Sequence, residues 1–151
     1  ALDRKVTAPA RQKALLTGLP AAAIELFDGR VVTGKTSSLL GASSAVLINA
    51  VKTLAGIDDD VHLISPSVIE PVQHLKVEHL GNQNPRLHTD EVLVALSMLS
   101  NHDENCRKAL EQLPNLRGCQ MHTTVMLSEV DHKVFKKLGI EVTCDPVREK
   151  E

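Results

Sequence analysis

The chain has 151 residues, the size of one ordinary domain, of which 42% are hydrophobic and 24% are charged. Its formal net charge of -2, with mixed signs along the chain, provides no basic stripe for nucleic acid. The two aromatic residues, Phe27 and Phe135, give bases almost nothing to stack on. These values predict a soluble globular protein that does not bind nucleic acid.

Cysteine usage and hydropathy indicate the compartment. Cys106, Cys119 and Cys144 are an odd number without the spacing of a disulfide framework, which favours a reducing environment. No apolar run approaches the roughly 18 residues typical of a membrane span, and residues 1–13 carry no signal-peptide pattern. We therefore expect a cytoplasmic domain of a longer protein, without membrane association.

The first predicted elements are a short helix and a β-hairpin. Residues 9–16 favour a helix that ends at Gly18 and Pro20. Asp28-Gly29 follows between two short apolar runs, which is the strongest local signal for a tight hairpin. Ser37 or Ser38 can then cap a helix that runs to about Ala55, and this helix is apolar on nearly all sides. We expect it to be covered on more than one face.

The rest of the chain alternates between strands and helices. The predicted order is a strand at 61–64, a helix from 65–67 to about residue 80, a polar loop at 81–85, a helix capped by Thr89, a helix at 103–113, a strand at 120–127, a helix at 131–138 and a strand at 140–144. This alternation predicts an α/β fold, a three-layer α-β-α sandwich around a mixed sheet of about five strands. We assign 1–20 to a helix and linker from a preceding domain, 21–147 to the α/β domain and 148–151 to a charged tail.

Residues 29–36 match the phosphate-binding pattern G-x-x-x-x-G-K-[ST]. A phosphate loop follows a buried strand and leads straight into a helix, whereas Gly29 is predicted in a hairpin turn. Val31 and Val32 are β-branched and suit a second strand better than a loop. We therefore interpret the first half of this motif as coincidental.

The second half of the motif, Gly34-Lys35-Thr36-Ser37, keeps a predicted role. A helix start presents unpaired amides and partial positive charge, and here a cation and hydroxyls lie beside it. The segment is therefore a candidate anion site, and Gln73 after the strand at 61–64 could face the same cleft. An ordinary serine cap beside a solvated lysine is the alternative.

The densest polar cluster lies around residue 88. Arg86, His88, Asp90 and Glu91 occupy a loop-to-helix junction, where functional groups often lie. A histidine beside carboxylates could act as a general base or bind a divalent metal. Helix capping with acidic residues in the first turn explains part of the same pattern.

Cys119 and His122 have the residue types of a zinc site, but residues three apart on a strand point to opposite faces. We therefore predict no metal site. Gln120, His122 and Thr124 share one face and could line a cleft, and Cys119 could be a nucleophile or a buried apolar residue. The candidate catalytic residues are His88, Asp90 and His122, and the candidate ligand-binding residues are Gly34, Lys35, Thr36, Ser37, Gln73 and Arg86.

Several motifs together resemble the C-terminal part of a bacterial protein family of unknown function. They are Gly34-Lys35-Thr36-Ser37, Ile64-Ser65-Pro66, Asn84-Pro85-Arg86-Leu87-His88-Thr89-Asp90-Glu91 and Gly118-Cys119. The likeness covers residues 21–146. Proteins of this family are longer, so the resemblance implies a separate N-terminal region as a partner.

The order of the elements up to residue 80 also resembles cytidine-deaminase-like domains. Such enzymes hold zinc through a His or Cys near a Glu at one helix start and a Pro-Cys-x-x-Cys at the next. Residues 41–44 and 69–74 lack the thiolate ligands. The resemblance therefore implies a related fold without deaminase chemistry.

The leading interpretation is a domain that binds a small anionic metabolite or nucleotide. One alternative is a non-catalytic assembly or interdomain-packing domain, which could form a homo-oligomer through its apolar helix. The other is a metal-dependent hydrolase that uses the candidate catalytic residues. The residues identify no cofactor.

Overall fold

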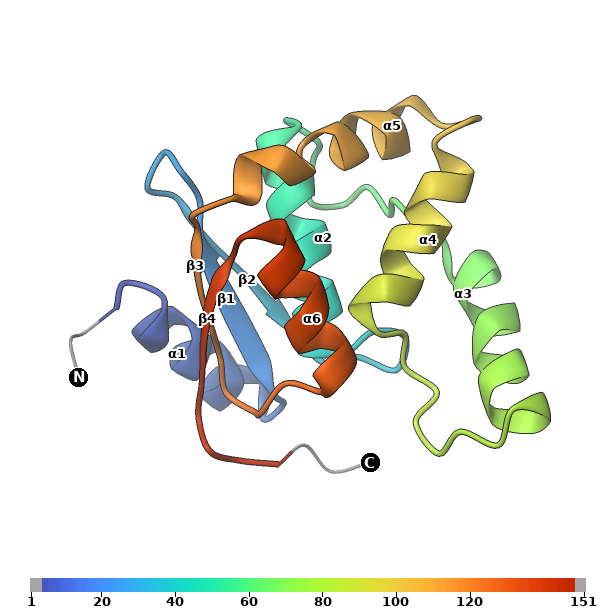
Figure 1. The fold of residues 1–151 in the computed structure, drawn as a ribbon, viewed down its shortest axis with the longest axis horizontal. Helices are drawn as coiled ribbons and strands as arrows, with labels where there is room; N and C mark the ends of the chain where they lie inside the picture. The colour runs from blue at the N-terminus through green and yellow to red at the C-terminus, as the bar shows by residue number, and fades with distance from the viewer. Residues whose placement is uncertain (1–3, 149–151) are drawn as a thin grey trace.

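The fold is built around a small mixed sheet with helices on both faces (Figure 1). A computed structural model describes residues 4–148. The strands are β1 (Ala21–Glu25), β2 (Val31–Lys35), β3 (Gln120–Thr123) and β4 (Glu141–Cys144), in the order β2-β1-β3-β4. β1 is antiparallel to β2 and β3, whereas β3 and β4 are parallel. The predicted α/β class and mixed sheet are confirmed, with four strands in the described range instead of about five.

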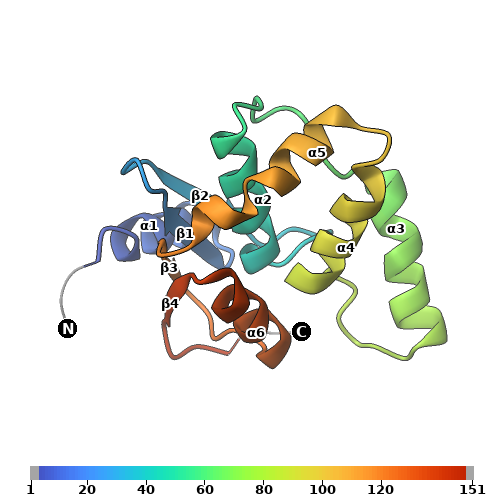
Figure 2. The same ribbon diagram turned by 45° about the horizontal axis from the view of Figure 1, so that its top comes forward.

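Helices cover the sheet unequally. They are α1 (Thr7–Thr17), α2 (Ala42–Leu54), α3 (Pro66–His74), α4 (Thr89–Leu99), α5 (Glu104–Glu111) and α6 (Glu129–Leu138), with a π-helical turn at Leu75–His79 and a 3-10 turn at Leu113–Leu116. α1 packs on one face of the sheet, while α2 and α6 pack on the other. α4 and α5 cover α2, and α3 lies beside α4 at the far end from the sheet in both views (Figure 2). Within the described range, every helix is too short or too polar to span a bilayer.

The apolar helix α2 is the centre of the core. Val46, Leu47, Ala50 and Val51 are buried, between β1 and β2 on one side and α4 and α5 on the other. The expectation that this helix is covered on more than one face is confirmed. Because elements of the same domain supply the cover, the apolar character of α2 requires no partner.

The hairpin is confirmed, and with it the coincidental nature of the first half of the phosphate-loop motif. Gly29 has φ 90°, and Gly34 and Lys35 belong to strand β2. A Cβ atom at Gly34 would lie 2.4 Å from the backbone nitrogen of Val46, a distance that side chains do not tolerate. Gly34 therefore permits the close packing of β2 on α2.

Three predicted elements need correction. Residues 61–64 are not a strand: Leu63 and Ile64 are buried, but they lie in an irregular link that receives a hydrogen bond from Cys106 Sγ at Leu63 O (3.2 Å). Burial alone gives a linker the apolar pattern of a strand. Since this strand carried part of the likeness to cytidine-deaminase-like domains, that likeness is not confirmed.

The long helix also begins later than predicted. Its first residue is Ala42, with Gly41 as N-cap, because residues 37–40 form a turn of their own. Ser37 Oγ accepts hydrogen bonds from the amides of Leu39 (3.2 Å) and Leu40 (3.1 Å). The predicted strand at 120–127 is shorter as well, because β3 ends at Thr123.

Candidate functional site

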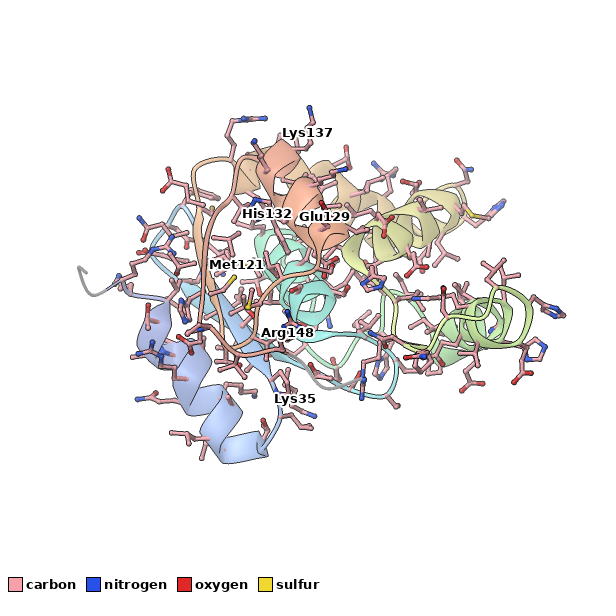
Figure 3. The ribbon with its side chains drawn as sticks, turned by 60° about the horizontal axis from the view of Figure 1, so that its bottom comes forward. Lys35, Met121, Glu129, His132, Lys137 and Arg148 are labelled. Carbon is pink, nitrogen blue, oxygen red and sulfur yellow. The ribbon has the colours of Figure 1, made fainter. Side chains whose placement is uncertain are left out.

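A cavity of about 290 Å³ opens where α2, α4 and α6 begin. Its walls come from the start of α2, the loop before α4, the segment before α6 and the C-terminal segment: Gly41, Ala42, Ser43, Asn84, Arg86, Leu87, His88, Val125, Met126, Leu127, Ser128, Asp131 and Arg148. In Figure 3, Arg148 lies between α6, marked by Glu129, and Lys35 at the end of β2. The volume is at the lower end of the range for small-molecule sites.

The start of α2 is the least satisfied of the three helix starts. Its N-cap is Gly41, which has no side chain to accept hydrogen bonds from the first turn. Ser43 in that turn is 8% exposed, and its hydroxyl makes no hydrogen bond with any residue in the range 4–148. Unpaired amides and the helix dipole give this end a partial positive charge. α2 therefore directs unpaired donors and positive potential at the cavity.

The other two helix starts are capped from within the domain. Ser128 Oγ accepts a hydrogen bond from the amide of Asp131 in α6 (3.2 Å). Asp131 Oδ1 in turn accepts from the amide (3.0 Å) and the hydroxyl (2.7 Å) of Thr89 at the start of α4. The predicted cap, Thr89, is thus the first residue of α4, and His88 is the N-cap. Asp131 is 8% exposed and places one carboxylate on the cavity wall.

Arg86 and His88 are presented by a loop that is bonded to the segment after β2. Arg86 Nε donates to Ser37 O (2.6 Å), and Leu87 N donates to Leu39 O (3.0 Å). Ser44 Oγ of α2 donates to Leu87 O (2.9 Å). These bonds fix the loop before any ligand binds, as a precise site requires.

A buried lysine holds the same loop from behind. Lys76, in the π-helical turn, is 3% exposed and donates to Arg86 O (2.7 Å) and Glu91 Oε1 (2.8 Å). Glu91 Oε1 also accepts from the amide of His88 (2.8 Å). π-Helical turns are frequent at functional sites, and this one inserts its cation beneath the loop. Lys76 therefore positions Arg86 and His88 without lining the cavity itself.

Only one of the six predicted ligand-binding residues lines the cavity. Arg86 lines it, and Gln73 supports the neighbouring turn through a hydrogen bond to Ser38 O (2.8 Å). Lys35 is exposed at the end of β2, and Thr36 is buried, with its amide bonded to Pro20 O (2.9 Å). Neither lines the cavity, because the helix begins after the turn at 37–40.

The predicted catalytic residues are not brought together. His88 lines the cavity, Asp90 is exposed beside a separate apolar groove, and His122 lies on β3. His122 Nδ1 is bonded to Thr143 Oγ1 (2.7 Å) and its Nε2 to Asp145 Oδ1 (3.0 Å). Among residues 4–148, no three His, Cys, Asp or Glu side chains are grouped as metal ligands.

His122 belongs to a polar cluster that fastens α1 to the sheet. Arg11 of α1 pairs with Asp145 through Nη2 (2.7 Å) and Nε (3.2 Å). The hydrogen bond from Arg11 is the main cause that lowers the pKa of the Asp145 carboxyl below its usual value. Arg4 adds hydrogen bonds to the backbone of Met121 (2.9 Å) and to Thr143 Oγ1 (2.5 Å). The polar groups of this cluster are engaged with one another.

The buried thiols are unsuited to nucleophilic catalysis. Burial raises the pKa of the Cys119 thiol above its usual value, and it raises that of Cys106 to about 11. A nucleophilic cysteine needs a lowered pKa, since the thiolate is the reactive form. Cys119 is therefore interpreted as a core residue.

Five polar residues of the cavity were not predicted as site residues: Ser43, Asn84, Ser128, Asp131 and Arg148. Ser43 lies in a run of small residues that suggested helix packing. Ser128 and Asp131 form a local capping pattern at a helix start, which indicated structure and not a site. Nothing in either pattern indicates that the two helix starts face one another.

The fold and the cavity define an α/β domain with a candidate pocket for a small polar ligand. Residues 2–151 match the family described as "Domain of unknown function DUF1846, C-terminal", and the chain belongs to this family. It is 60% identical to a UPF0371 protein of Corynebacterium aurimucosum over 96% of the chain, and 53% identical to one of Streptococcus uberis over 96%. The chain spans 29% of the length of each of these relatives. The resemblance to a family of longer bacterial proteins is confirmed.

Proposed function

We propose that this domain binds a small anionic metabolite in the cavity at the start of α2, as part of a longer cytoplasmic protein. The observation that carries the proposal is the uncapped, positive end of α2 beside the guanidinium groups of Arg86 and Arg148. Helix N-termini bind phosphate and carboxylate groups through amides and dipole, and arginine is the side chain best shaped for either group.

The balance of charge on the cavity wall supports an anion. Among residues 4–148, the cavity is lined by two arginines, Arg86 and Arg148, and by one carboxylate, that of Asp131. One oxygen of this carboxylate already accepts two hydrogen bonds from Thr89, which offset part of its charge. The small volume favours a phosphorylated metabolite or a mononucleotide over a larger cofactor.

Calorimetric titration of the chain with inorganic phosphate, sugar phosphates and nucleoside monophosphates tests the proposal. Arg86→Gln should weaken binding of the best ligand by about tenfold or more, since hydrogen bonds to charged groups contribute about 1.5–3 kcal/mol. Lys35→Gln is the matched control, because it removes one positive charge outside the cavity. This variant should change the Kd by less than about twofold, because salt screens the interaction between a distant charge and the ligand.

The anion site would be contradicted if the unaltered chain bound none of these anions, or if Arg86→Gln and Lys35→Gln weakened binding equally. Arg86 also bonds Ser37 O, so Ser43→Ala serves as a second variant whose side chain has no bond to lose among residues 4–148. It should weaken phosphate binding without lowering the melting temperature.

Of the three predicted catalytic residues, His88 alone lines the cavity. The separation of His88, Asp90 and His122 gives a metal-dependent hydrolase no support from geometry. Binding, and not a particular reaction, is therefore what we propose for this domain.

A second role, interdomain packing, is supported by an apolar groove between α3 and α4. The apolar residues that line this groove of about 420 Å³ include Val68, Val72, Ala95, Met98 and Leu99, and Met98 is 69% exposed. Exposed apolar patches of this kind mark interaction surfaces. Because the relatives are much longer than this chain, we propose that another region of the longer protein covers it.

Dye binding and sedimentation of the isolated chain test this second role. We expect the uncovered groove to bind an apolar fluorescent dye, and Met98→Asp should reduce that binding severalfold without changing phosphate affinity. A chain that binds no dye and stays monomeric at high concentration would contradict a packing surface here.

A further inference from the structure

We infer that the anionic ligand also carries a hydroxyl group, which Asp131 recognises, so that the site takes a small sugar phosphate or a similar phosphorylated polyol. The inference rests on the proposed anion site and names the class of its ligand. It starts from two polar side chains on the cavity wall that their neighbours leave partly unsatisfied.

The first is the carboxylate of Asp131. Both hydrogen bonds from Thr89 end on Oδ1, and no residue in the range 4–148 bonds Oδ2. In that part of the chain every side-chain nitrogen or oxygen that is sealed from solvent has a partner. Oδ2 is therefore accessible to solvent, and we assign this access to the cavity that Asp131 lines. An ionised carboxylate only accepts hydrogen bonds, so its complement is an O–H or N–H donor.

The second is the hydroxyl of Ser43. Its side chain lines the cavity and is only 8% exposed, and the hydroxyl too has no partner among residues 4–148. A hydroxyl at the first turn of a helix can donate to an anion together with the helix amides. Ser43 thus adds, independently of the helix dipole, a donor aimed at the place where the anion is proposed.

The cavity therefore has two chemically different ends. Ser43, the α2 amides and Arg86 form an end rich in donors, and Asp131 Oδ2 forms an acceptor. A ligand that satisfies both has an acceptor-rich anion and a separate donor. The P–OH donors of inorganic phosphate belong to the anion itself, so inorganic phosphate has no separate donor for Asp131.

Charge distinguishes a hydroxyl donor from an ammonium donor. An amino acid offers a carboxylate and an ammonium, but its net charge is zero. Arg86, Arg148 and the α2 dipole together exceed the charge of one carboxylate, so the site favours a ligand with net negative charge. A phosphate dianion with a neutral hydroxyl meets this condition.

The experiment compares matched ligands on the intact chain. Calorimetry measures the affinities of inorganic phosphate, ethyl phosphate, glycerol 3-phosphate, ribose 5-phosphate and L-serine. Ethyl phosphate is the control without a hydroxyl. We expect the two hydroxylated phosphates to bind about tenfold or more tightly than ethyl phosphate, the fold-change of one hydrogen bond to a charged group.

Asp131→Asn converts the acceptor into a donor with little change of shape. Its Oδ1 can still accept from Thr89, while its Nδ2 replaces the oxygen that faces the cavity. The preference for hydroxylated phosphates should then shrink to within about twofold, and inorganic phosphate should bind at least as tightly as before. Thermal unfolding shows whether the variant folds, and the comparison of ligands on the unaltered chain needs no variant.

The outcomes separate the two proposals. If no phosphate binds, or if Ser43→Ala has no effect on phosphate, the anion site fails. If phosphate binds and Ser43→Ala weakens it, but ethyl phosphate equals glycerol 3-phosphate or Asp131→Asn leaves the preference intact, the sugar-phosphate inference is overturned and the anion site stands. Tighter binding of L-serine than of glycerol 3-phosphate also overturns it.

Discussion

Two polar regions flank the sheet, and they differ in how completely their groups are satisfied. On the α1 side, His122 and Asp145 have partners on both of their polar atoms. On the α2 side, Ser43 and one oxygen of Asp131 have none among residues 4–148. The His122 cluster looks more like an active centre from its residue types, yet the α2 side is the better candidate. Polar groups at a cavity that no neighbour satisfies are free to bind a ligand, whereas satisfied ones stabilise the fold.

Among the variants that test this contrast, a substitution of Lys76 should cause the largest loss of stability. Lys76→Met leaves Arg86 O and Glu91 without their buried donor, and should lower the free energy of unfolding by about 3 kcal/mol. Urea denaturation measures the loss, and phosphate binding should weaken as well, because the loop of Arg86 loosens.

Lys108→Met is the control for Lys76. Lys108 forms an exposed pair with Glu104 on α5, so the loss should stay below about 0.5 kcal/mol. Equal losses in the two variants would show that Lys76 does not hold the loop.

His122→Leu should cause the next largest loss of stability. It removes two hydrogen bonds from a side chain that is 4% exposed, which should lower the free energy of unfolding by about 2 kcal/mol. Phosphate affinity should not change. His102→Leu, at an exposed turn, is the control. A variant of His122 that keeps its stability but loses phosphate binding would reverse the contrast between the two regions.

Acid should destabilise the α1 side through Asp145. The hydrogen bond from Arg11 lowers the folded-state pKa of this carboxyl, so its stabilising effect is complete above the unfolded value, about 3.9, and is lost as pH falls through the folded value. The stability of the unaltered chain should therefore fall more steeply below about pH 4 than that of Asp145→Asn. Melting temperatures across that range measure this, and parallel curves would exclude the assigned cause.

The smallest effect on stability is expected at Ser43. Its hydroxyl has no partner in residues 4–148, and alanine is a good helix former, so Ser43→Ala should change the free energy of unfolding by less than about 0.5 kcal/mol. Its phosphate affinity should nevertheless fall severalfold in calorimetry. A clear loss of stability would mean that the hydroxyl has a structural role.

Local signals predicted most of the elements. Asp28-Gly29 predicted the hairpin, since Gly29 supplies the positive φ of its turn. Asp103 caps α5 through the amides of Asn105 (2.9 Å) and Cys106 (3.3 Å), close to the predicted helix start. Both patterns act through neighbours in the chain. At residues 61–64 the apolar pattern reflects burial and not a strand, so the prediction of a strand there was wrong.

The candidate site was predictable only in part, through Arg86 and His88. Lys35 and Thr36 were placed at a helix start that lies further along the chain, because Ser37 accepts the bonds of a separate turn. His122 was grouped with His88, whereas β3 directs it to the α1 side.

The sequence by itself determined that the chain is an α/β domain with a hairpin that is not a phosphate loop, because turns, caps and apolar periodicity act over a few residues. The tertiary structure alone decided that the starts of α2, α4 and α6 meet at one cavity. It also decided which of them is left uncapped: Asp131 of α6 satisfies Thr89 of α4, while Gly41 leaves α2 without a cap. The arrangement of these helix starts depends on packing between segments that are distant in the chain, so no local sequence pattern predicts it.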